Sequence, residues 1–562
     1  MKLIISTYLR TLKERDEFDK LLPDLLNSMG IIPTSKTQRG TRQNGVDLSA
    51  IGIDPKDNIE KLFLFVLKQG DIGRSNWDTG TQDVRPSLNE IFDVYLRSCV
   101  PSNAQRLPKK IVLGTTGDLK EEIQPNWAGY TNDHKDDAEF DFWGADEISN
   151  FIQKYLLNEN LFDKDERNDL RRTLALIGEP DYSLKHFYNI LQRQLNFDKN
   201  GVFTKDKKKV KEIQKALVRV NLATRLLTNW AENEGNIKPA VIGAERAVVW
   251  SWNLLNQLSE RDRKKLLPSF KNIWNTYSDI SKKFLTKIER HCMVRDGLSG
   301  YTRDSSLFSI LVFEIIGLVS SIGLSHFYFS NNNTYSEFKT AQKATSLLVG
   351  IIQNNSISNS PCFDENCIDI TLAMSLLMLM GENKIASQWL IDIVEVFGYT
   401  MSKRYFYPIS TDNFDDLITS RTESLNEDVF KKLTNMSWLI PTFAGWAVNL
   451  KQEEFYKNLY VMMSGVCKET TAQLWYPLSK DLNDLYFSPL HHKAGHSEAP
   501  IKLEVDINSY KEIMLKFLEL DHFDCVEKSP TYNYGYFGID FIAYRHFRTL
   551  VPANYWYRFC NM

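Results

Sequence analysis

The sequence predicts an α/β domain at its amino end, followed by a large all-α region. Over roughly the first 160 residues, segments with a helical period alternate with short apolar runs of strand length. Beyond that point the apolar residues keep a helical period between polar turns, and few segments alternate as strands do. At 562 residues the chain is too long for one ordinary core, so we expect two or three domains.

The first predicted elements are one helix and two strands. Apolar residues with a 3.6-residue period predict a helix over residues 18–30, which Gly30 is placed to end. A short apolar alternation over 44–51 predicts a strand with Asp47 near its start. The near-continuous apolar run 62–68 predicts a strand buried on both faces, closed by Lys68. A lysine in that position is costly unless it has a partner or a task.

The following elements complete the predicted α/β domain. Pro86 suits the start of a helix whose apolar stripe runs to residue 96. Residues 110–115 predict another buried strand. Residues 140–148 and the apolar positions after them predict a last strand with a closing helix. We therefore place the α/β domain at residues 1–157.

This order of helix, Asp-bearing strand and lysine-ended strand resembles the restriction-endonuclease-like superfamily, the PD-(D/E)xK nucleases, and most closely its Mrr-like branch. The resemblance covers residues 1 to about 157 and implies a metal-dependent endonuclease that uses Mg²⁺, with Mn²⁺ as an alternative ion. It assigns Asp19 to the helix position, Asp47 to the metal position and Lys68 to the catalytic lysine, with the Leu67 carbonyl as a further metal ligand. A glutamine also recurs ahead of the helix in Mrr-like nucleases. Gln82 is therefore a secondary catalytic candidate, although an ordinary loop amide explains it equally well.

Phosphodiester hydrolysis needs these residue types. Oxygen ligands hold a Mg²⁺ ion that lowers the pKa of the attacking water, and a cation stabilises the developing charge. The sequence departs from the family at Val66, where Glu or Gln is usual, and Asp71 is the nearest substitute carboxylate. The alternative is a catalytically inactive nuclease-like fold that serves as a protein-interaction or sensor module, in which Lys68 pairs with Asp47 in the core.

The charge of the first domain bears on its substrate. Residues 1–160 contain 20 Lys and Arg against 25 Asp and Glu, so their formal net charge is −5. Because nonspecific DNA affinity comes mainly from phosphate neutralisation, binding would need a local concentration of basic residues. The candidates for nucleic-acid contact are Lys36, Arg39, Arg42 and Arg74, for which a solvated basic loop is an equal alternative. We expect the nucleic acid to be DNA.

Composition indicates a folded cytoplasmic protein. The chain is 43% hydrophobic and 25% charged, which is typical of globular proteins. Its first residues turn polar at once and do not form a secretory signal. Seven scattered cysteines do not make a disulfide framework, which agrees with a reducing compartment.

Residues 158–205 are predicted as a helical connector and residues 206–562 as an all-α sensing or interaction domain. Within the latter, residues 371–390 have the pattern of an antiparallel helix pair, typical of an irregular solenoid or bundle. Such surfaces bind protein partners, so we expect a partner or self-association through this domain. By analogy of domain arrangement alone, the helical domain would gate a nuclease with a restriction or anti-phage defence role.

The segment 307–329 is long and apolar enough to cross a bilayer. It contains Glu314 near its middle, and an ionisable group at the bilayer centre is expensive. We therefore predict that it is the central buried helix of the all-α domain, and we do not expect a membrane partner.

Overall fold

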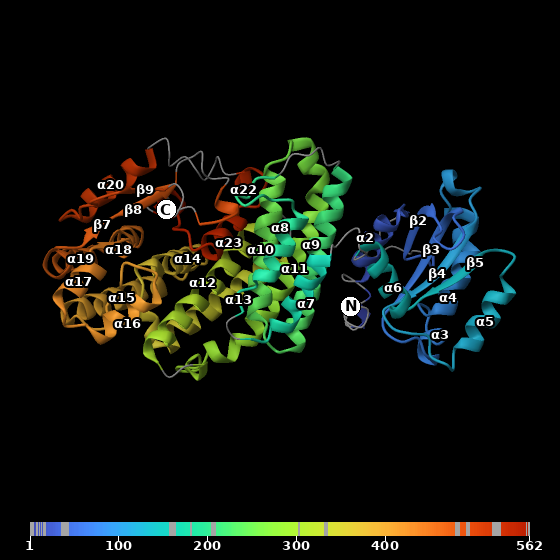
Figure 1. The fold of residues 1–562 in the computed structure, drawn as a ribbon, viewed down its shortest axis with the longest axis horizontal. Coiled ribbons are helices and arrows are strands. Elements are labelled where there is room, and N and C mark those ends of the chain that lie inside the picture. The colour runs from blue at the N-terminus through green and yellow to red at the C-terminus, as the bar shows by residue number, and fades with distance from the viewer. Residues whose placement is uncertain are drawn as a thin grey trace. The chain divides into compact units, whose positions relative to one another are not determined.

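The computed structural model describes residues 18–559 apart from 35–43, 157–163, 180–181, 204–209, 302–303, 331–334, 478–483, 490–494, 520–529 and 558, and also describes Ile5, Ser6, Leu9, Arg10, Leu12 and Glu14. The chain divides into two compact units (Figure 1). Unit 1 comprises residues 1–179, 185–190 and 218–233, and unit 2 comprises 180–184, 191–217 and 234–562.

Unit 1 is built on a five-stranded mixed sheet in the order β1-β2-β3-β4-β5. The strands are β1 (Ile32–Pro33), β2 (Leu48–Ile53), β3 (Glu60–Lys68), β4 (Lys109–Thr115) and β5 (Glu139–Trp143). The pairs β1/β2 and β2/β3 are antiparallel, whereas β3/β4 and β4/β5 are parallel. The residues just before β2 therefore lie at the same end of the sheet as the carboxyl ends of β3 and β4. The predicted α/β fold of this region is confirmed.

Alternation along β3 sends its side chains into two separate cores. Phe63, Phe65 and Leu67 belong to one buried cluster, and Leu62, Leu64 and Val66 belong to the other. This two-sided burial is the arrangement that the uninterrupted apolar run of β3 predicts. The helices of unit 1 are α2 (Asp19–Met29), α3 (Arg74–Trp77), α4 (Val84–Glu90), α5 (Gln124–Asp133), α6 (Ala145–Phe151), α7 (Lys164–Leu176), the first part of α8 (Lys185–Gln194) and the second part of α9 (Val210–Asn233).

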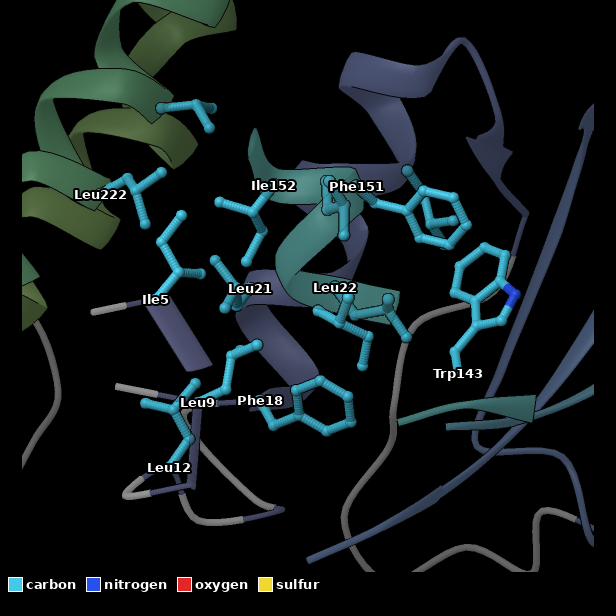
Figure 2. Packing of buried hydrophobic residues seen from close by; sticks show 14 of the residues in the cluster. Ile5, Leu9, Leu12, Phe18, Leu21, Leu22, Trp143, Phe151, Ile152 and Leu222 are labelled. Atoms are coloured by element: carbon cyan, nitrogen blue, oxygen red, sulfur yellow. The ribbon is translucent and has the colours of Figure 1, made fainter. Parts of the chain in front are cut away.

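The first cluster packs α2, α6 and the second part of α9 together (Figure 2). In Figure 2, Ile152 lies near Leu21 of α2, and Ile5 lies between Leu21 and Leu222 of α9. The cluster also includes Leu170, Leu174 and Ile190 from α7 and α8. Residues beyond the predicted boundary at 157 therefore complete the core of unit 1.

Two predicted helices in unit 1 have informative ends. The helix predicted over 18–30 is confirmed as α2, and Gly30 ends it with φ +85, a conformation that glycine adopts without strain. The helix predicted over 86–96 begins two residues earlier, at Val84 of α4. It then continues as a π-helical segment, η2 (Ile91–Cys99).

Unit 2 is mostly helical, as predicted for the second region. Its long helices are α10 (Lys238–Asn256), α11 (Glu260–Cys292), α12 (Ser305–Ser330), α13 (Tyr335–Asn354), α14 (Cys367–Leu379), α15 (Asn383–Lys403), α18 (Leu439–Asn449), α19 (Glu453–Val466) and α20 (Ile507–Glu519). The shorter ones are α16 (Phe414–Thr422), α17 (Glu427–Leu433), α22 (Pro530–Asn533), α23 (Gly538–His546) and α24 (Ala553–Trp556). Two short sheets accompany them: β6 (Met436–Ser437) with β7 (Thr471–Ala472), and β8 (Leu474–Pro477) with β9 (Gly495–Glu498).

Helices α14 and α15 are in contact and form the helix pair predicted over 371–390, joined through Gly381 with φ +82. Helix α12 contains the long apolar segment. Within the described residues it alone is long and apolar enough to cross a membrane, and 72% of its most apolar window is buried inside the protein. It packs on α13, α14 and α23, and Glu314 accepts a hydrogen bond from Lys238 Nζ at 2.6 Å.

Candidate functional site

The nuclease-type candidates lie at the sheet end formed by the carboxyl ends of β3 and β4. Asp47 directly precedes β2, and its backbone N–H donates to the carbonyl of Phe65 at 2.9 Å. Its Oδ2 accepts a hydrogen bond from the backbone N–H of Leu67 at 2.7 Å. The structure therefore brings the Asp47 carboxylate to the backbone of Leu67, one residue before Lys68.

Lys68 is the last residue of β3 and is half-buried. Its ammonium donates to the backbone carbonyl of Gln82 at 2.7 Å. It forms no ion pair with a carboxylate in the part of the chain that the structure describes, so the Lys68–Asp47 core pair of the alternative interpretation is not present here. The side chain of Gln82 is exposed, and its carbonyl rather than its amide holds the lysine.

Asp19 lies in the first turn of α2 and is half-buried. The neighbouring Phe18 ring lies 3.9 Å from the point that a Cβ on Gly114 would occupy, and Leu67 Cδ2 lies 3.0 Å from the same point. The start of α2 therefore reaches the end of the sheet at which Asp47 and Lys68 lie.

The position that carries Glu or Gln in the family is part of the hydrophobic core. Val66 is fully buried, pairs with Leu113 across the parallel β3/β4 register, and supplies no metal ligand. The substitute carboxylate Asp71 is exposed, and its Oδ1 accepts the backbone N–H of Asp118 at 2.9 Å and Arg10 Nη1 at 3.3 Å. Asp71 is therefore engaged in fixing the loop after β4.

Of the predicted nucleic-acid contacts, the structure describes Arg74. Arg74 is the exposed first residue of α3, and its backbone N–H donates to Glu122 Oε1 at 3.2 Å. Lys36, Arg39 and Arg42 lie outside the described residues.

A second group of carboxylates lies at the opposite end of the sheet, where β3, β4 and β5 begin. The ligand oxygens of Asp54, Asp57 and Glu139 all lie within 4.8 Å of one another and could hold a metal ion. Asp54 is buried, whereas Asp57 and Glu139 are exposed. Sequence reasoning missed this group because its members come from the β2–β3 turn and from β5, far apart in the chain.

Two lysine ammonium groups already lie among these carboxylates. Lys61 is 1% exposed; its Nζ donates to Asp54 Oδ2 at 3.1 Å and to Glu139 Oε2 at 2.5 Å, and it also bonds Asp57. Lys110 is 4% exposed, and its Nζ lies 2.6 Å from Asp54 Oδ2 and 3.1 Å from Asp141 Oδ2. A metal ion would have to compete with the Lys61 ammonium for the same oxygens.

The charges of this group stabilise one another. Burial alone would raise the pKa of Asp54, but hydrogen bonds from Lys110, the Lys56 N–H and Lys61 outweigh it and lower that pKa. Burial would lower the pKa of Lys61, and its hydrogen bonds to Asp57, Glu139 and Asp54 outweigh this and raise it. The ion pairs thus favour the charged forms of Asp54 and Lys61.

No protein-family model, curated protein or solved structure matches this chain in comparisons with known proteins. The α/β domain has two groups of functional side chains, one at each end of its sheet. One is the acidic cluster of Asp54, Asp57 and Glu139, which could bind a metal, and the other is formed by Asp47 and Lys68 at the carboxyl ends of the strands.

Proposed function

We propose that the chain is a metal-dependent nuclease that hydrolyses phosphodiester bonds in DNA. The observation that carries the proposal is the position of Asp47, whose carboxylate is bonded to Leu67 N–H beside Lys68 at the carboxyl ends of a mixed sheet. A carboxylate and a lysine on neighbouring strands of such a sheet are the pair that the restriction-endonuclease-like resemblance requires. Ligand sites of open α/β sheets also lie at this end.

The side chains present fit a hydrated hard cation with few protein ligands. Asp47 would supply a carboxylate oxygen, Leu67 a backbone carbonyl and Asp19 a second carboxylate. Val66 contributes nothing, but Mg²⁺ keeps several waters even in well-ligated sites. When bound, the ion would lower the pKa of a coordinated water and draw charge from the scissile phosphate.

Within this proposal, Lys68 stabilises the transition state. Its ammonium would lie beside the phosphate oxygens as the water oxygen bonds to phosphorus and the ester oxygen leaves. The carbonyl of Gln82 would orient this ammonium, because it is the group that Lys68 Nζ bonds in the structure. Gln82 would then act through its backbone, so changing its side chain should matter little.

The test is cleavage of linear and circular DNA by the full chain with Mg²⁺ or Mn²⁺. We expect Asp47→Ala and Lys68→Met each to lower the rate by at least about a hundredfold, the scale of removing a charged transition-state contact. The matched control is Asp57→Ala with Glu139→Ala, which removes the exposed carboxylates of the other group and should leave cleavage intact. If Asp47→Ala cleaves as fast as wild type while the control variant does not, the metal site belongs at the opposite end of the sheet.

A second candidate function is a catalytically silent interaction module. It is supported by Val66 in the hydrophobic core and by the Lys61 ammonium among the remaining carboxylates. Isothermal titration with Mn²⁺, together with the cleavage assay, separates the two candidates. Wild type that binds no Mn²⁺ and cleaves neither DNA nor RNA favours the silent module.

We further propose that unit 2 gates the nuclease, in the setting of restriction or anti-phage defence. The support is the acidic charge of residues 1–160 and the size of the helical unit, which suits recognition of a protein partner. A chain ending at Asn233 retains all of unit 1, including the α9 residues of its core. Greater cleavage by this shortened chain than by the full chain would support gating, and equal robust cleavage by both would contradict it.

A further inference from the structure

Unit 2 contains a basic groove between α11 and α13. The two helices pack on each other, and a hollow of about 450 Å³ lies along their contact. Its lining is formed by Lys282, Leu285, Thr286, Tyr335, Ser336, Lys339, Thr340 and Lys343. We call this surface the α11/α13 groove, and none of the functions above makes use of it.

The three lysines of the groove have partly or fully exposed side chains. Lys282 and Lys343 have side chains that are 35% and 33% exposed, and Lys339 is exposed. Lys339 Nζ lies 4.6 Å from the centre of the Tyr335 ring and meets no carboxylate among the described residues. The Tyr335 side chain is itself 76% exposed at the start of α13.

Two carboxylates near the groove, Glu337 and Glu289, form ion pairs with Lys282 and Lys343. Glu337 is turned beneath the groove, where His326 bonds it and Ser278 Oγ donates to it at 3.2 Å. Lys282 Nζ reaches Glu337 only at 3.4 Å. Lys343 Nζ lies 2.9 Å from Glu289 in a solvent-exposed pair. Exposed pairs contribute little to stability, so Lys343 can exchange Glu289 for a phosphate oxygen at small cost. Glu337 keeps its bonds to His326 and Ser278 when Lys282 turns toward a phosphate.

The groove also offers a hydroxyl and an aromatic face. Ser336 is exposed and lines the groove beside the lysines, whereas the Thr286 and Thr340 hydroxyls donate to the backbone carbonyls of Lys282 and Ser336. Lysines and hydroxyls are the usual ligands of nucleic-acid phosphates, and an exposed tyrosine is a surface on which an unpaired base can stack. Fully paired bases are stacked inside the helix, so an exposed ring favours a single strand over a duplex.

We propose that the α11/α13 groove binds single-stranded nucleic acid, with Lys282, Lys339 and Lys343 on the phosphates and Tyr335 under a base. The inference deepens the proposed nuclease function, because it supplies a basic surface to a chain whose residues 1–160 have a net negative charge. The biological role of this binding rests on the proposed nuclease function, but the binding itself is measured without cleavage. DNA and RNA share this chemistry, and the experiment compares them.

The experiment is fluorescence anisotropy of labelled DNA and RNA oligonucleotides with the full chain, in EDTA, over a range of salt. The groove variant carries Lys282→Gln, Lys339→Gln and Lys343→Gln. We expect its affinity to fall about tenfold or more. Because each phosphate contact contributes roughly 0.7 to the log–log salt slope for single strands, that slope should become shallower by about 2. The matched control changes three lysines of α11 outside the groove: Lys264→Gln, Lys265→Gln and Lys271→Gln.

Tyr335 gives an independent readout. Tyr335→Ala should weaken binding about fivefold or more without changing the salt slope, whereas Tyr335→Phe should bind as wild type does, because stacking needs the ring and not the hydroxyl. Circular dichroism and thermal unfolding of each variant identify any loss of folding. The DNA and RNA arms show which strand the groove prefers.

The following results would overturn the inference. Equal binding by wild type and the groove variant would place the nucleic acid elsewhere. Poly-glutamate that competes as well as the oligonucleotide would assign the groove to an acidic protein, and wild-type binding to anionic vesicles without oligonucleotide binding would assign it to a lipid surface. The two proposals fail separately. Wild type that binds the oligonucleotide but does not cleave it would refute only the nuclease, and Asp47→Ala that binds normally but does not cleave would support both proposals.

Discussion

Asp54 is the most informative residue of the ion-pair network in unit 1, because it is 1% exposed and one of its oxygens serves both buried lysines. Asp54→Asn removes this charge and keeps the shape. Breaking a buried ion pair by removing one partner costs about 3–5 kcal/mol. Lys110 keeps Asp141 at 3.1 Å and Lys61 keeps Glu139 at 2.5 Å, so we expect the lower end, about 3 kcal/mol.

Hydrogen–deuterium exchange of the β3 and β4 amides measures this cost locally. A loss of about 3 kcal/mol would speed exchange through global opening of unit 1 by roughly a hundredfold. The control is Asp57→Asn, which removes an exposed carboxylate from the same network and should have a smaller effect. Since the pKa of Asp54 is lowered in the folded protein, its contribution is present above its unfolded pKa of about 4 and is lost as the pH falls through the folded value.

Unchanged protection in Asp54→Asn at neutral pH would refute the view that this group holds unit 1 together. The same measurement with Mg²⁺ separates an ion-pair network from a metal site. Because the Lys61 ammonium lies among the three carboxylates, we expect any protection of β3 that Mg²⁺ confers to be the same in Asp57→Asn as in wild type. Strong protection by Mg²⁺ that Asp57→Asn abolishes would assign the group to a metal.

Two further predictions concern packing. Leu222→Ala, in the part of α9 that packs into the first core, should destabilise unit 1 by about 2–5 kcal/mol. Leu176→Ala, at a position that is 37% exposed, should cost much less. Chemical unfolding of the chain ending at residue 233 measures both free energies, and equal effects would contradict the shared core. Gly317→Ala should destabilise unit 2 by about 1–3 kcal/mol despite the helix propensity of alanine, because its Cβ would lie 2.1 Å from Asp369 Oδ1. A Cβ at Gly465 would have no atom within 4 Å, so Gly465→Ala should stabilise the protein by up to about 1 kcal/mol. Unfolding temperatures that shift in the same direction for both variants would contradict this prediction.

The sequence by itself determined the elements whose pattern is local. The period of α2, the apolar run of β3 and the Gly-containing turn between α14 and α15 each depend on neighbouring residues, and the structure has all three. The resemblance singled out Asp47 and Lys68, and the antiparallel pairing of β2 with β3 in the structure puts them at one end of the sheet. Whether these residues bind a metal and cleave a phosphodiester remains a prediction.

Only the tertiary structure decided the contacts between distant segments. Lys61 and Glu139 are 78 residues apart, and no local period marks them as partners. The same holds for Leu222, whose helix looks like part of the all-α region yet packs into the core of unit 1. The α11/α13 groove likewise needs Lys282 and Lys339 on two packed helices. Hydrophobic periodicity specifies which face of a helix or strand is buried, whereas the element that packs against that face is determined by how the whole chain folds.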